Sequence, residues 1–246
     1  MKAYEKTMHL LSSLKLRGIL SRLDEEINEA ETMKVSYISF LNTLLQAEIT
    51  DRRERRLRRN MAAAHFPVEK TIEGFEFGRV KGVTKSEVSQ LLDFRWLDNH
   101  HNILWFGPPG VGKSHLSIAL GIKAVEAGYT VCFEKINNLI KLLTTADIQR
   151  ASGFRIKRIM KSDLVIIDEI GYTPIERKEA NIFFNLISEL YERSSIIITS
   201  NKSFDGWAEM MGDEIMTAAL LDRLLHHARV FNLDGESYRL KGKEEE

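Results

Sequence analysis

Eight consecutive residues in the middle of the chain have the types and the spacing that bind nucleotide phosphates. They are Gly107, Pro108, Pro109, Gly110, Val111, Gly112, Lys113 and Ser114, and His115 follows them. In the pattern G-x-x-x-x-G-K-[ST], the glycines let backbone N–H groups approach the phosphates, because they carry no Cβ. The lysine offers a positive charge to the β- and γ-phosphates, and the serine offers a hydroxyl to Mg²⁺. We therefore predict that this loop and His115 bind ATP with Mg²⁺, and that Lys113 assists the reaction.

Two carboxylates follow a buried strand candidate further along the chain. Four apolar residues, 164–167, lead directly into Asp168 and Glu169. In a parallel sheet, ligands bind at the carboxyl ends of the strands, so both side chains are expected at the nucleotide. Asp168 is predicted to hold Mg²⁺, directly or through water, and Glu169 to orient and polarise the attacking water. A base for water favours an ATPase over a nucleotide-binding switch.

Two further side chains have types that act on phosphates, and each also has an ordinary structural explanation. Asn201 follows the segment 195–200, which is largely apolar. It either caps that segment or hydrogen-bonds the γ-phosphate or the attacking water, if its strand lies between those that carry the two preceding motifs. Arg223 is either a helix-surface arginine paired with Asp222 or an arginine finger that reaches the ATP of a neighbouring subunit. We predict the catalytic role for both.

Strand and helix patterns alternate around these residues. Strand candidates lie at residues 101–106, 129–134, 164–168, 195–200 and 228–233, and residues 114–127 have the apolar spacing of a helix. Continuous apolar strands separated by helices indicate a parallel sheet that is covered on both faces. The predicted fold class is therefore α/β. The helix after the glycine-rich loop is expected to direct its N-terminus at the phosphates.

Residues 1–66 are predicted to be helical throughout and to form a separate interaction domain. They contain no proline and one glycine, and Ser36 is placed to cap a long helix. Proline at position 67 disfavours helix before it, so the nucleotide domain is predicted at residues 67–246. Residues 51–59 contain six arginines and two acids, and the arginines include Arg52, Arg53, Arg55 and Arg56. These arginines either form a solvated helix face or bind DNA phosphates or an acidic partner.

Composition excludes several other classes of protein. The chain has 246 residues and a formal net charge of zero, so any nucleic-acid site must be local. No apolar run is long enough to span a membrane, and the N-terminus does not resemble a signal peptide, so we expect a cytoplasmic protein. The single cysteine, Cys132, excludes a cysteine-based zinc site. The adjacent His226 and His227 are not predicted to bind zinc, because neighbouring side chains diverge on a helix.

Three segments together resemble the AAA+ ATPases, and in detail the IstB-type transposition helper ATPases of bacterial insertion sequences, relatives of the DnaC-type helicase loaders. The segments are GPPGVGKSHL, DLVIIDEIGYTPIERKEANIFFNLISELYERSSIIITSN and GDEIMTAALLDRLLHHARVFNLDGESYR. The resemblance implies a P-loop NTPase fold with a five-stranded parallel sheet in the order 5-1-4-3-2, an N-terminal all-α subdomain and a missing or reduced C-terminal lid. It also implies that Asn201 is the first sensor, Arg223 the finger, and Arg239 a candidate second sensor at the nucleotide.

The resemblance further implies self-assembly on duplex DNA with ATP bound between subunits, recruitment or stimulation of a transposase, and disassembly driven by ATP hydrolysis. Seven basic residues between the second and third strands, on two expected helices, give this partial support. They are Lys135, Lys141, Arg150, Arg155, Lys157, Arg158 and Lys161. They form either a solvated helical face or a surface that contacts DNA phosphates with little sequence readout. The set has no aromatic stacking platform, which favours duplex DNA over single strands.

Two other functions fit parts of the sequence. A replicative helicase loader of the DnaC type would bind a helicase through residues 1–66 and would prefer single-stranded DNA. A small-molecule kinase is disfavoured, because Asp168 and Glu169 supply a water activator and no lid for a phosphate acceptor is evident.

Overall fold

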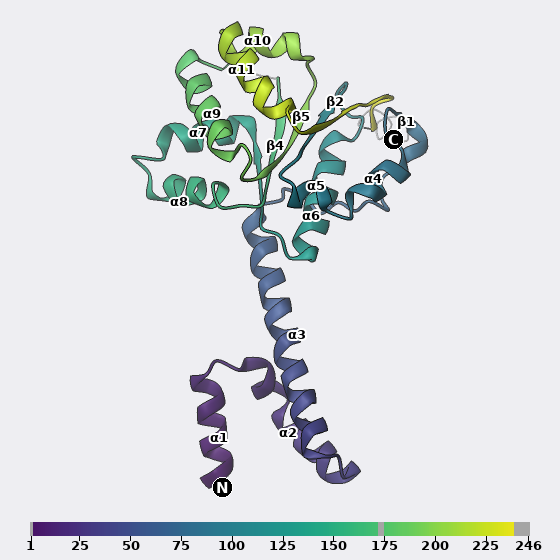
Figure 1. The fold of residues 1–246 in the computed structure, drawn as a ribbon, viewed down its shortest axis with the longest axis vertical. Coiled ribbons are helices and arrows are strands. Elements are labelled where there is room, and N and C mark those ends of the chain that lie inside the picture. Colours follow the sequence, from purple (N-terminus) through teal and green to yellow (C-terminus); the bar gives the residue numbers. More distant parts are fainter. Residues whose placement is uncertain (1, 172–174, 239–246) are drawn as a thin grey trace, which may run out of the picture. The chain divides into compact units, whose positions relative to one another are not determined.

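The computed structural model describes residues 2–171 and 175–238, and the chain divides into two compact units, Met1–Arg59 and Asn60–Glu246 (Figure 1). The division lies before the predicted boundary at residues 66 and 67, inside the helix α3 (Tyr37–Ala64). The difference arises because the last turns of α3 belong to the second unit, where Arg155 donates hydrogen bonds to the carbonyl oxygens of Ala63 and Ala64. The predicted boundary at residues 66 and 67 lies just after the end of α3 at Ala64.

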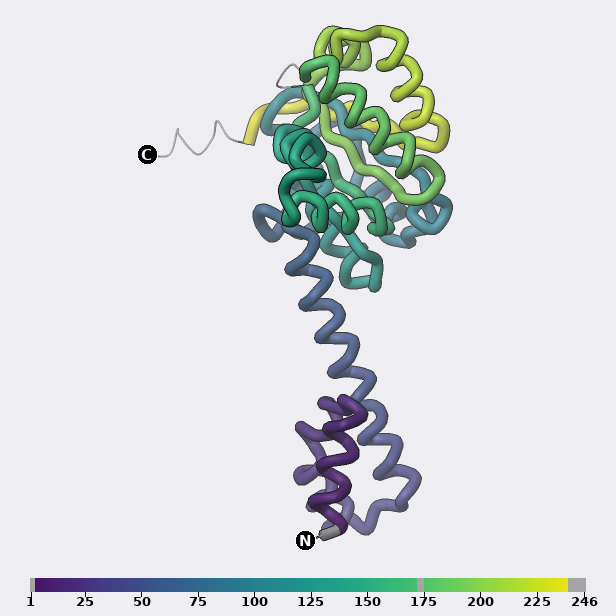
Figure 2. Tube along the Cα trace, turned by 90° about the vertical axis from the view of Figure 1, so that its left-hand side faces the viewer, coloured from purple at the N-terminus to yellow at the C-terminus, as the bar shows by residue number. Residues whose placement is uncertain are grey.

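The first unit consists of α1 (Lys2–Ser13), α2 (Arg17–Met33) and the first part of α3, in agreement with the predicted helices (Figure 2). The Ser36 hydroxyl accepts a hydrogen bond of 3.2 Å from the Ser39 N–H, which confirms the predicted cap of α3. The hydrophobic core of this unit contains the buried residues Ile19, Leu23 and Leu44, with Met8, Leu11, Leu16, Ile27 and Phe40 packed against them.

A buried carboxylate joins α2 to α3. Glu48 accepts hydrogen bonds from the N–H groups of Gly18 (2.7 Å) and Ile19 (3.3 Å), in the first turn of α2. Gly18 permits this contact, because a Cβ there would lie 2.6 Å from the Ala47 carbonyl oxygen. Burial alone would raise the pKa of Glu48, but hydrogen bonds from Arg52 and from the two backbone groups outweigh burial and lower this pKa.

The second unit is built around a parallel sheet of five strands in the order β3-β4-β5-β2-β6. The strands are β2 (Asn102–Phe106), β3 (Val131–Lys135), β4 (Leu164–Ile170), β5 (Ser195–Ser200) and β6 (Ala228–Asn232). Numbered from one to five along the chain, they are in the order 5-1-4-3-2, so the predicted α/β class and strand order are confirmed. Because β5 lies between β2 and β4, the strands that carry the three predicted motifs are neighbours.

Helices cover both faces of this sheet (Figure 1). One face is covered by α6 (Lys113–Ala127), and the other by α7 (Ile136–Thr145), α9 (Arg177–Leu190), α10 (Phe204–Met211) and α11 (Glu214–Leu225). Along β4, Val165 and Ile167 belong to the core beneath α7 and α9, whereas Ile166 lies against Gly121 of α6. Burial on both faces explains why the strands read as continuous apolar runs in the sequence.

The remaining elements are short. They are η1 (Phe77–Arg79), β1 (Val80–Lys81), α4 (Lys85–Leu91), α5 (Arg95–Asp98), α8 (Arg150–Ile159) and β7 (Asp234–Gly235). β1 pairs with β7 in an antiparallel ladder, which holds the segment after β6 beside the segment before β2. None of the helices described is long and apolar enough to cross a membrane.

Candidate functional site

The glycine-rich loop connects β2 to α6 at the carboxyl end of the sheet. Gly107 and Gly112 have φ angles of +143° and +94°, and a Cβ on Gly112 would lie 2.4 Å from the ring of Phe75. The Lys113 ammonium donates hydrogen bonds across the loop to the carbonyl oxygens of Gly107 (2.6 Å) and Pro108 (2.8 Å). The loop is therefore shaped as a phosphate-binding loop requires, with the N-terminus of α6 directed into it.

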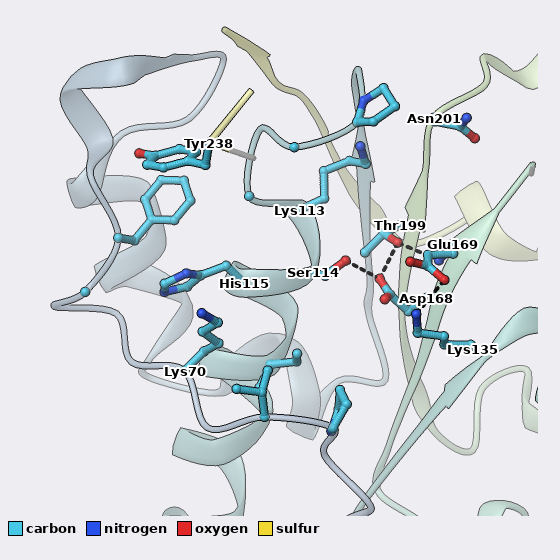
Figure 3. Close-up of a pocket in the computed structure, with 18 of the residues that line it drawn as sticks. Lys70, Lys113, Ser114, His115, Lys135, Asp168, Glu169, Thr199, Asn201 and Tyr238 are labelled. Atoms are coloured by element: carbon cyan, nitrogen blue, oxygen red, sulfur yellow. Dashed lines mark hydrogen bonds and ion pairs between the residues drawn. The ribbon is translucent and has the colours of Figure 1, made fainter. Parts of the chain in front are cut away.

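Hydrogen bonds join this loop to the two predicted carboxylates (Figure 3). Ser114 donates to Asp168 Oδ1 (2.7 Å), and Thr199 donates to the same oxygen (2.6 Å). The Thr199 hydroxyl also accepts a hydrogen bond of 2.9 Å from the backbone N–H of Glu169. Thr199 thus positions the carboxylate of Asp168 and the backbone of Glu169, and the sequence prediction missed it. The available signal was a hydroxyl directly after three consecutive isoleucines, two residues before Asn201.

Glu169 has an unusual backbone conformation at the end of β4. Its φ is +67°, and the register between β4 and β5 shifts between Ile167 and Ile170, as at a β-bulge. A non-glycine residue in this left-handed region costs about 1–3 kcal/mol, and such strain concentrates at functional sites. The Glu169 carboxylate forms an ion pair of 2.8 Å with Lys135, the last residue of β3. Lys135 was predicted to contact DNA, but its ammonium lies in the nucleotide site instead (Figure 3).

Asn201 follows β5, between the strands that lead to Lys113 and Asp168, so its position meets the condition for a catalytic role. Its side-chain oxygen is buried and has no hydrogen-bond partner among the described residues. A buried polar atom without a partner costs about 1–3 kcal/mol. The acceptor is thus unsatisfied in a residue that lines the nucleotide cavity.

A cavity of about 540 Å³ extends from these residues to the segment 67–76, and its volume is typical of small-molecule sites. At the end away from Asp168, three rings form one wall (Figure 3). The ring centroid of Phe75 lies 5.4 Å from that of His115 and 6.5 Å from that of Tyr238. His115 is anchored by a contact of 2.8 Å between Nε2 and the Thr71 carbonyl oxygen. This aromatic wall suits a nucleotide base, and it includes His115, the predicted neighbour of the loop.

The segment after β7 closes this wall. The Tyr238 N–H donates a hydrogen bond of 3.1 Å to the Gly110 carbonyl oxygen of the phosphate-binding loop. Burial and the nearby Glu76 carboxylate raise the pKa of Tyr238, so its phenol stays protonated at neutral pH. Arg239, the candidate second sensor, lies outside the described residues.

The residues around Asp168 fit a magnesium ion. The Ser114 hydroxyl oxygen and Asp168 Oδ1 lie 2.7 Å apart, and adjacent oxygen ligands of an octahedral magnesium ion are about 3 Å apart. Asp168 is only 2% exposed, and a buried carboxylate is stabilised by a cation. Magnesium held there would neutralise charge on the β- and γ-phosphate oxygens.

Arg223 lies outside the nucleotide cavity of its own chain. It is near the end of α11, where its guanidinium donates to the Ala219 carbonyl oxygen (2.8 Å) and lies 4.9 Å from the centre of the Phe184 ring. Among the described residues that line the nucleotide cavity there is no arginine. Its own nucleotide is therefore not the partner of the Arg223 side chain in this structure.

The predicted basic insertion forms α7 and α8, but its members differ in exposure. Arg155 is 8% exposed, forms an ion pair of 2.6 Å with Glu134 and donates to the Phe133 carbonyl oxygen. We therefore remove Arg155 from the predicted DNA-binding set, because its face of α8 packs on β3 and holds the end of α3. Arg158 is half-buried. The exposed members on and after these helices are Lys141, Arg150, Lys157 and Lys161.

The arginines of α3 are partly engaged with acids on the same helix. Arg52 pairs with Glu48 at 2.6 Å, and Arg55 pairs with Asp51 at 2.7 Å. Arg52 and Arg53 are exposed, whereas Arg55 is half-buried. The predicted contact of Arg52, Arg53, Arg55 and Arg56 with DNA or an acidic partner stays a prediction.

The strand order, the phosphate-binding loop and the adjacent Asp168, Glu169 and Asn201 define a P-loop nucleotide-binding protein of the AAA+ class. The chain belongs to the family of IstB-like ATP-binding proteins, whose model matches residues 9–246. It is therefore an ATP-binding protein of the insertion-sequence type.

Relatives agree with this assignment, and solved structures share the fold. An ATP-binding protein of insertion sequence IS21 from Pseudomonas aeruginosa is 40% identical over 234 residues, which cover 95% of this chain and 88% of the relative. The ATP-binding protein of insertion sequence IS5376 from Geobacillus stearothermophilus is 40% identical over 214 residues, which cover 87% of this chain and 85% of the relative. The crystal structure of DnaI shares the fold with a TM-score of 0.58 and 14% identity over 68% of this chain and 92% of that one. The DnaC helicase loader has a TM-score of 0.52 and 16% identity, over 72% and 99%.

Proposed function

We propose that this protein assembles on duplex DNA when it binds ATP, recruits or stimulates the transposase of its insertion sequence, and disassembles after it hydrolyses ATP. The observation that carries the proposal is the position of Arg223 outside its own nucleotide cavity, whose described lining contains no arginine. A cavity that a neighbour completes makes assembly depend on nucleotide, because the γ-phosphate is then contacted from both sides of the interface.

Each residue of the site has a distinct role in this scheme. Lys113 and the backbone N–H groups of its loop bind the phosphates, and Ser114 with Asp168 would hold magnesium. Glu169 accepts a proton from the attacking water, and Asn201, which lines the same cavity, orients that water. Thr199 holds the Asp168 carboxylate and the Glu169 backbone through its two hydrogen bonds.

Contact with DNA is assigned to the exposed cations Lys141, Arg150, Lys157 and Lys161. Phosphate contacts of this kind give salt-dependent affinity with little sequence preference, as a helper that accepts many target sites requires. A structural neighbour with a TM-score of 0.54, the replication initiator DnaA, is described as bound to a nucleotide analogue and single-stranded DNA. At 20% identity this similarity supports a shared fold only. The proposed DNA contact of this protein therefore rests on its exposed cations.

The first unit offers a surface for a protein partner. Ile38, Leu41, Leu45 and Ile49 are spaced along one side of α3 and are 69%, 49%, 46% and 59% exposed. A row of exposed apolar side chains on a monomer marks an interaction site. We assign this surface to the transposase.

A DnaC-like helicase loader is the second candidate function, and one observation favours it. Phe154 on α8 is 60% exposed, and the Arg150 guanidinium lies 5.4 Å from the centre of its ring. An exposed aromatic ring among cations is the stacking platform that single-stranded DNA uses, and the sequence prediction had counted none. Tighter binding to single strands than to duplex at equal salt would favour this candidate.

The proposal is tested by mass photometry and electron microscopy of the protein with duplex DNA. Three samples are compared, with a non-hydrolysable ATP analogue, with ADP and without nucleotide. DNA-bound oligomers are expected only in the sample that contains the analogue. Lys113→Ala should bind ATP about 100-fold more weakly, because a charged partner of the phosphates is lost, and should not assemble. Lys123→Ala, on the same helix and paired with Glu126, is the control and should assemble normally. Monomers in all three samples, or equal assembly without nucleotide, would refute the proposal.

Lys135 is expected to restrain hydrolysis through its ion pair with Glu169. Lys135→Met frees the Glu169 carboxylate, so the ATPase rate without DNA should rise, by up to about fivefold for a pair this exposed, and DNA should stimulate it less. Phosphate release measured with and without duplex DNA checks this. Lys123→Met removes a comparable Lys–Glu ion pair of 2.9 Å away from the site and should change neither rate. An unchanged or lower basal rate in Lys135→Met would show that the ion pair does not restrain Glu169.

A further inference from the structure

Three side chains that can ligate a metal converge at the amino ends of the strands, at the opposite end of the sheet from the nucleotide cavity. Glu192, His226 and His227 each offer one ligand atom, and these atoms all lie within 4.8 Å of one another. Glu192 precedes β5 and His227 precedes β6, so the cluster lies at the amino ends of these strands, whereas the nucleotide residues lie at the carboxyl ends.

The two histidines converge because they do not lie on a helix. α11 ends at Leu225, and β6 begins at Ala228, so His226 and His227 form the turn between them. Their ring centroids are 4.1 Å apart. The prediction that these side chains diverge assumed a helix. It was wrong because α11 ends at Leu225 and contains neither histidine.

A buried asparagine holds the segments that carry the cluster. Asn102, at the start of β2, is 7% exposed and donates its side-chain N–H to the Leu224 carbonyl oxygen (2.9 Å). Its side-chain oxygen accepts from the Ile196 N–H (2.9 Å), and its backbone N–H donates to the His227 carbonyl oxygen (2.7 Å). One residue thus ties the end of α11, the turn and β5 together, so the ligand-bearing backbone is organised in advance.

Neighbouring side chains orient the imidazoles as the outer shell of a metal site does. The Tyr191 hydroxyl lies 2.6 Å from His226 Nδ1, which commits that nitrogen and leaves Nε2 for a ligand. The His227 ring stacks on His101, with centroids 5.1 Å apart.

We propose that Glu192, His226 and His227 bind one divalent transition-metal ion, with Zn²⁺ as the best match. Two imidazoles and a carboxylate are ligands of zinc, whereas magnesium and calcium prefer oxygen alone. With metal–ligand bonds of about 2.0–2.1 Å, tetrahedral ligand atoms are about 3.4 Å apart, so the exposed side chains reach this geometry by small rotations. Three ligands leave a fourth position for water. The bound ion would also fix the end of α11, which carries Arg223.

The test is calorimetric titration of the untagged protein with ZnCl₂ and, separately, with MgCl₂ in the absence of nucleotide. We expect one Zn²⁺ to bind per chain. Any binding of Mg²⁺ should be the same in Glu192→Gln as in the unsubstituted protein. Glu192→Gln, His226→Ala and His227→Ala should each weaken Zn²⁺ binding at least about 10-fold, and Tyr191→Phe about 10-fold through the lost outer-shell contact. The control is His9→Ala, an exposed histidine on α1, which should bind Zn²⁺ as the natural chain does.

A second measurement separates a built site from loose surface binding. Co²⁺ in place of Zn²⁺ should give the intense visible absorption of a tetrahedral site, and Glu192→Gln, a change at an exposed residue, should remove it. Circular dichroism confirms that each variant is folded. A dissociation constant above about 100 µM, or Zn²⁺ binding that none of the ligand substitutions weakens, would overturn the proposal.

Discussion

Glu169→Gln is expected to lower the rate of ATP hydrolysis at least about 100-fold while leaving ATP binding intact. The amide has nearly the shape of the carboxylate but cannot accept a proton from water, and a positioned general base contributes about 10²–10⁴-fold to rate. The residues that bind the phosphates are untouched, since Lys113, Ser114 and Asp168 keep their contacts. If hydrolysis drives disassembly, this variant should remain on duplex DNA in ATP as a stable oligomer.

Phosphate release and the lifetime of DNA-bound oligomers measure the two effects separately. Glu126→Gln is the matched control, because Glu126 also pairs with a lysine, at 2.9 Å, but lies away from the cavity. A loss of rate smaller than about 10-fold would remove Glu169 as the base. Rapid dissociation of Glu169→Gln from DNA in ATP would instead refute the link between hydrolysis and disassembly.

Arg223→Ala is expected to bind ATP normally and to hydrolyse it about 10³-fold more slowly, because an arginine finger neutralises charge that develops in the transition state. In this structure Arg223 lies on Phe184 and outside its own cavity, so the loss must occur at the interface with a neighbour. The variant should therefore also assemble poorly. Phosphate release per subunit and mass photometry with an ATP analogue measure both effects.

Mixing two inactive variants tests whether the arginine acts between subunits. The Arg223→Ala subunit keeps Glu169, and the Glu169→Gln subunit keeps Arg223. Where the intact Arg223 of one faces the nucleotide cavity of the other, the interface contains a complete site. We expect the mixture to recover a substantial part of the wild-type rate when both single variants are nearly inactive. Arg193→Ala, an exposed arginine paired with Glu189, is the control and should be fully active alone. No recovery in mixed oligomers of confirmed composition would reject the finger.

Much of the nucleotide site was predictable from the amino-acid sequence because its chemistry is carried by contiguous residues. A loop with glycines at fixed spacing can fold around a phosphate only in a few ways, and Asp168 and Glu169 follow a strand whose apolar run identifies it. The α/β class follows from the same alternation of strands and helices, whereas the strand order came from family resemblance. The helices of the first unit were predictable from spacing and from the Ser36 cap.

The remaining features depend on which distant residues meet, and local patterns do not contain that information. Lys135 and Arg155 both read as basic residues of one DNA-facing insertion, but the pairing of β3 with β4 places Lys135 on Glu169. The packing of α8 buries Arg155 against Glu134. Likewise, helix periodicity could not show that α11 ends at Leu225, where Asn102 binds the Leu224 carbonyl oxygen and the two histidines turn toward Glu192. Charge and residue type are local properties, whereas the partner of each charge is set by strand order and by the faces that pack.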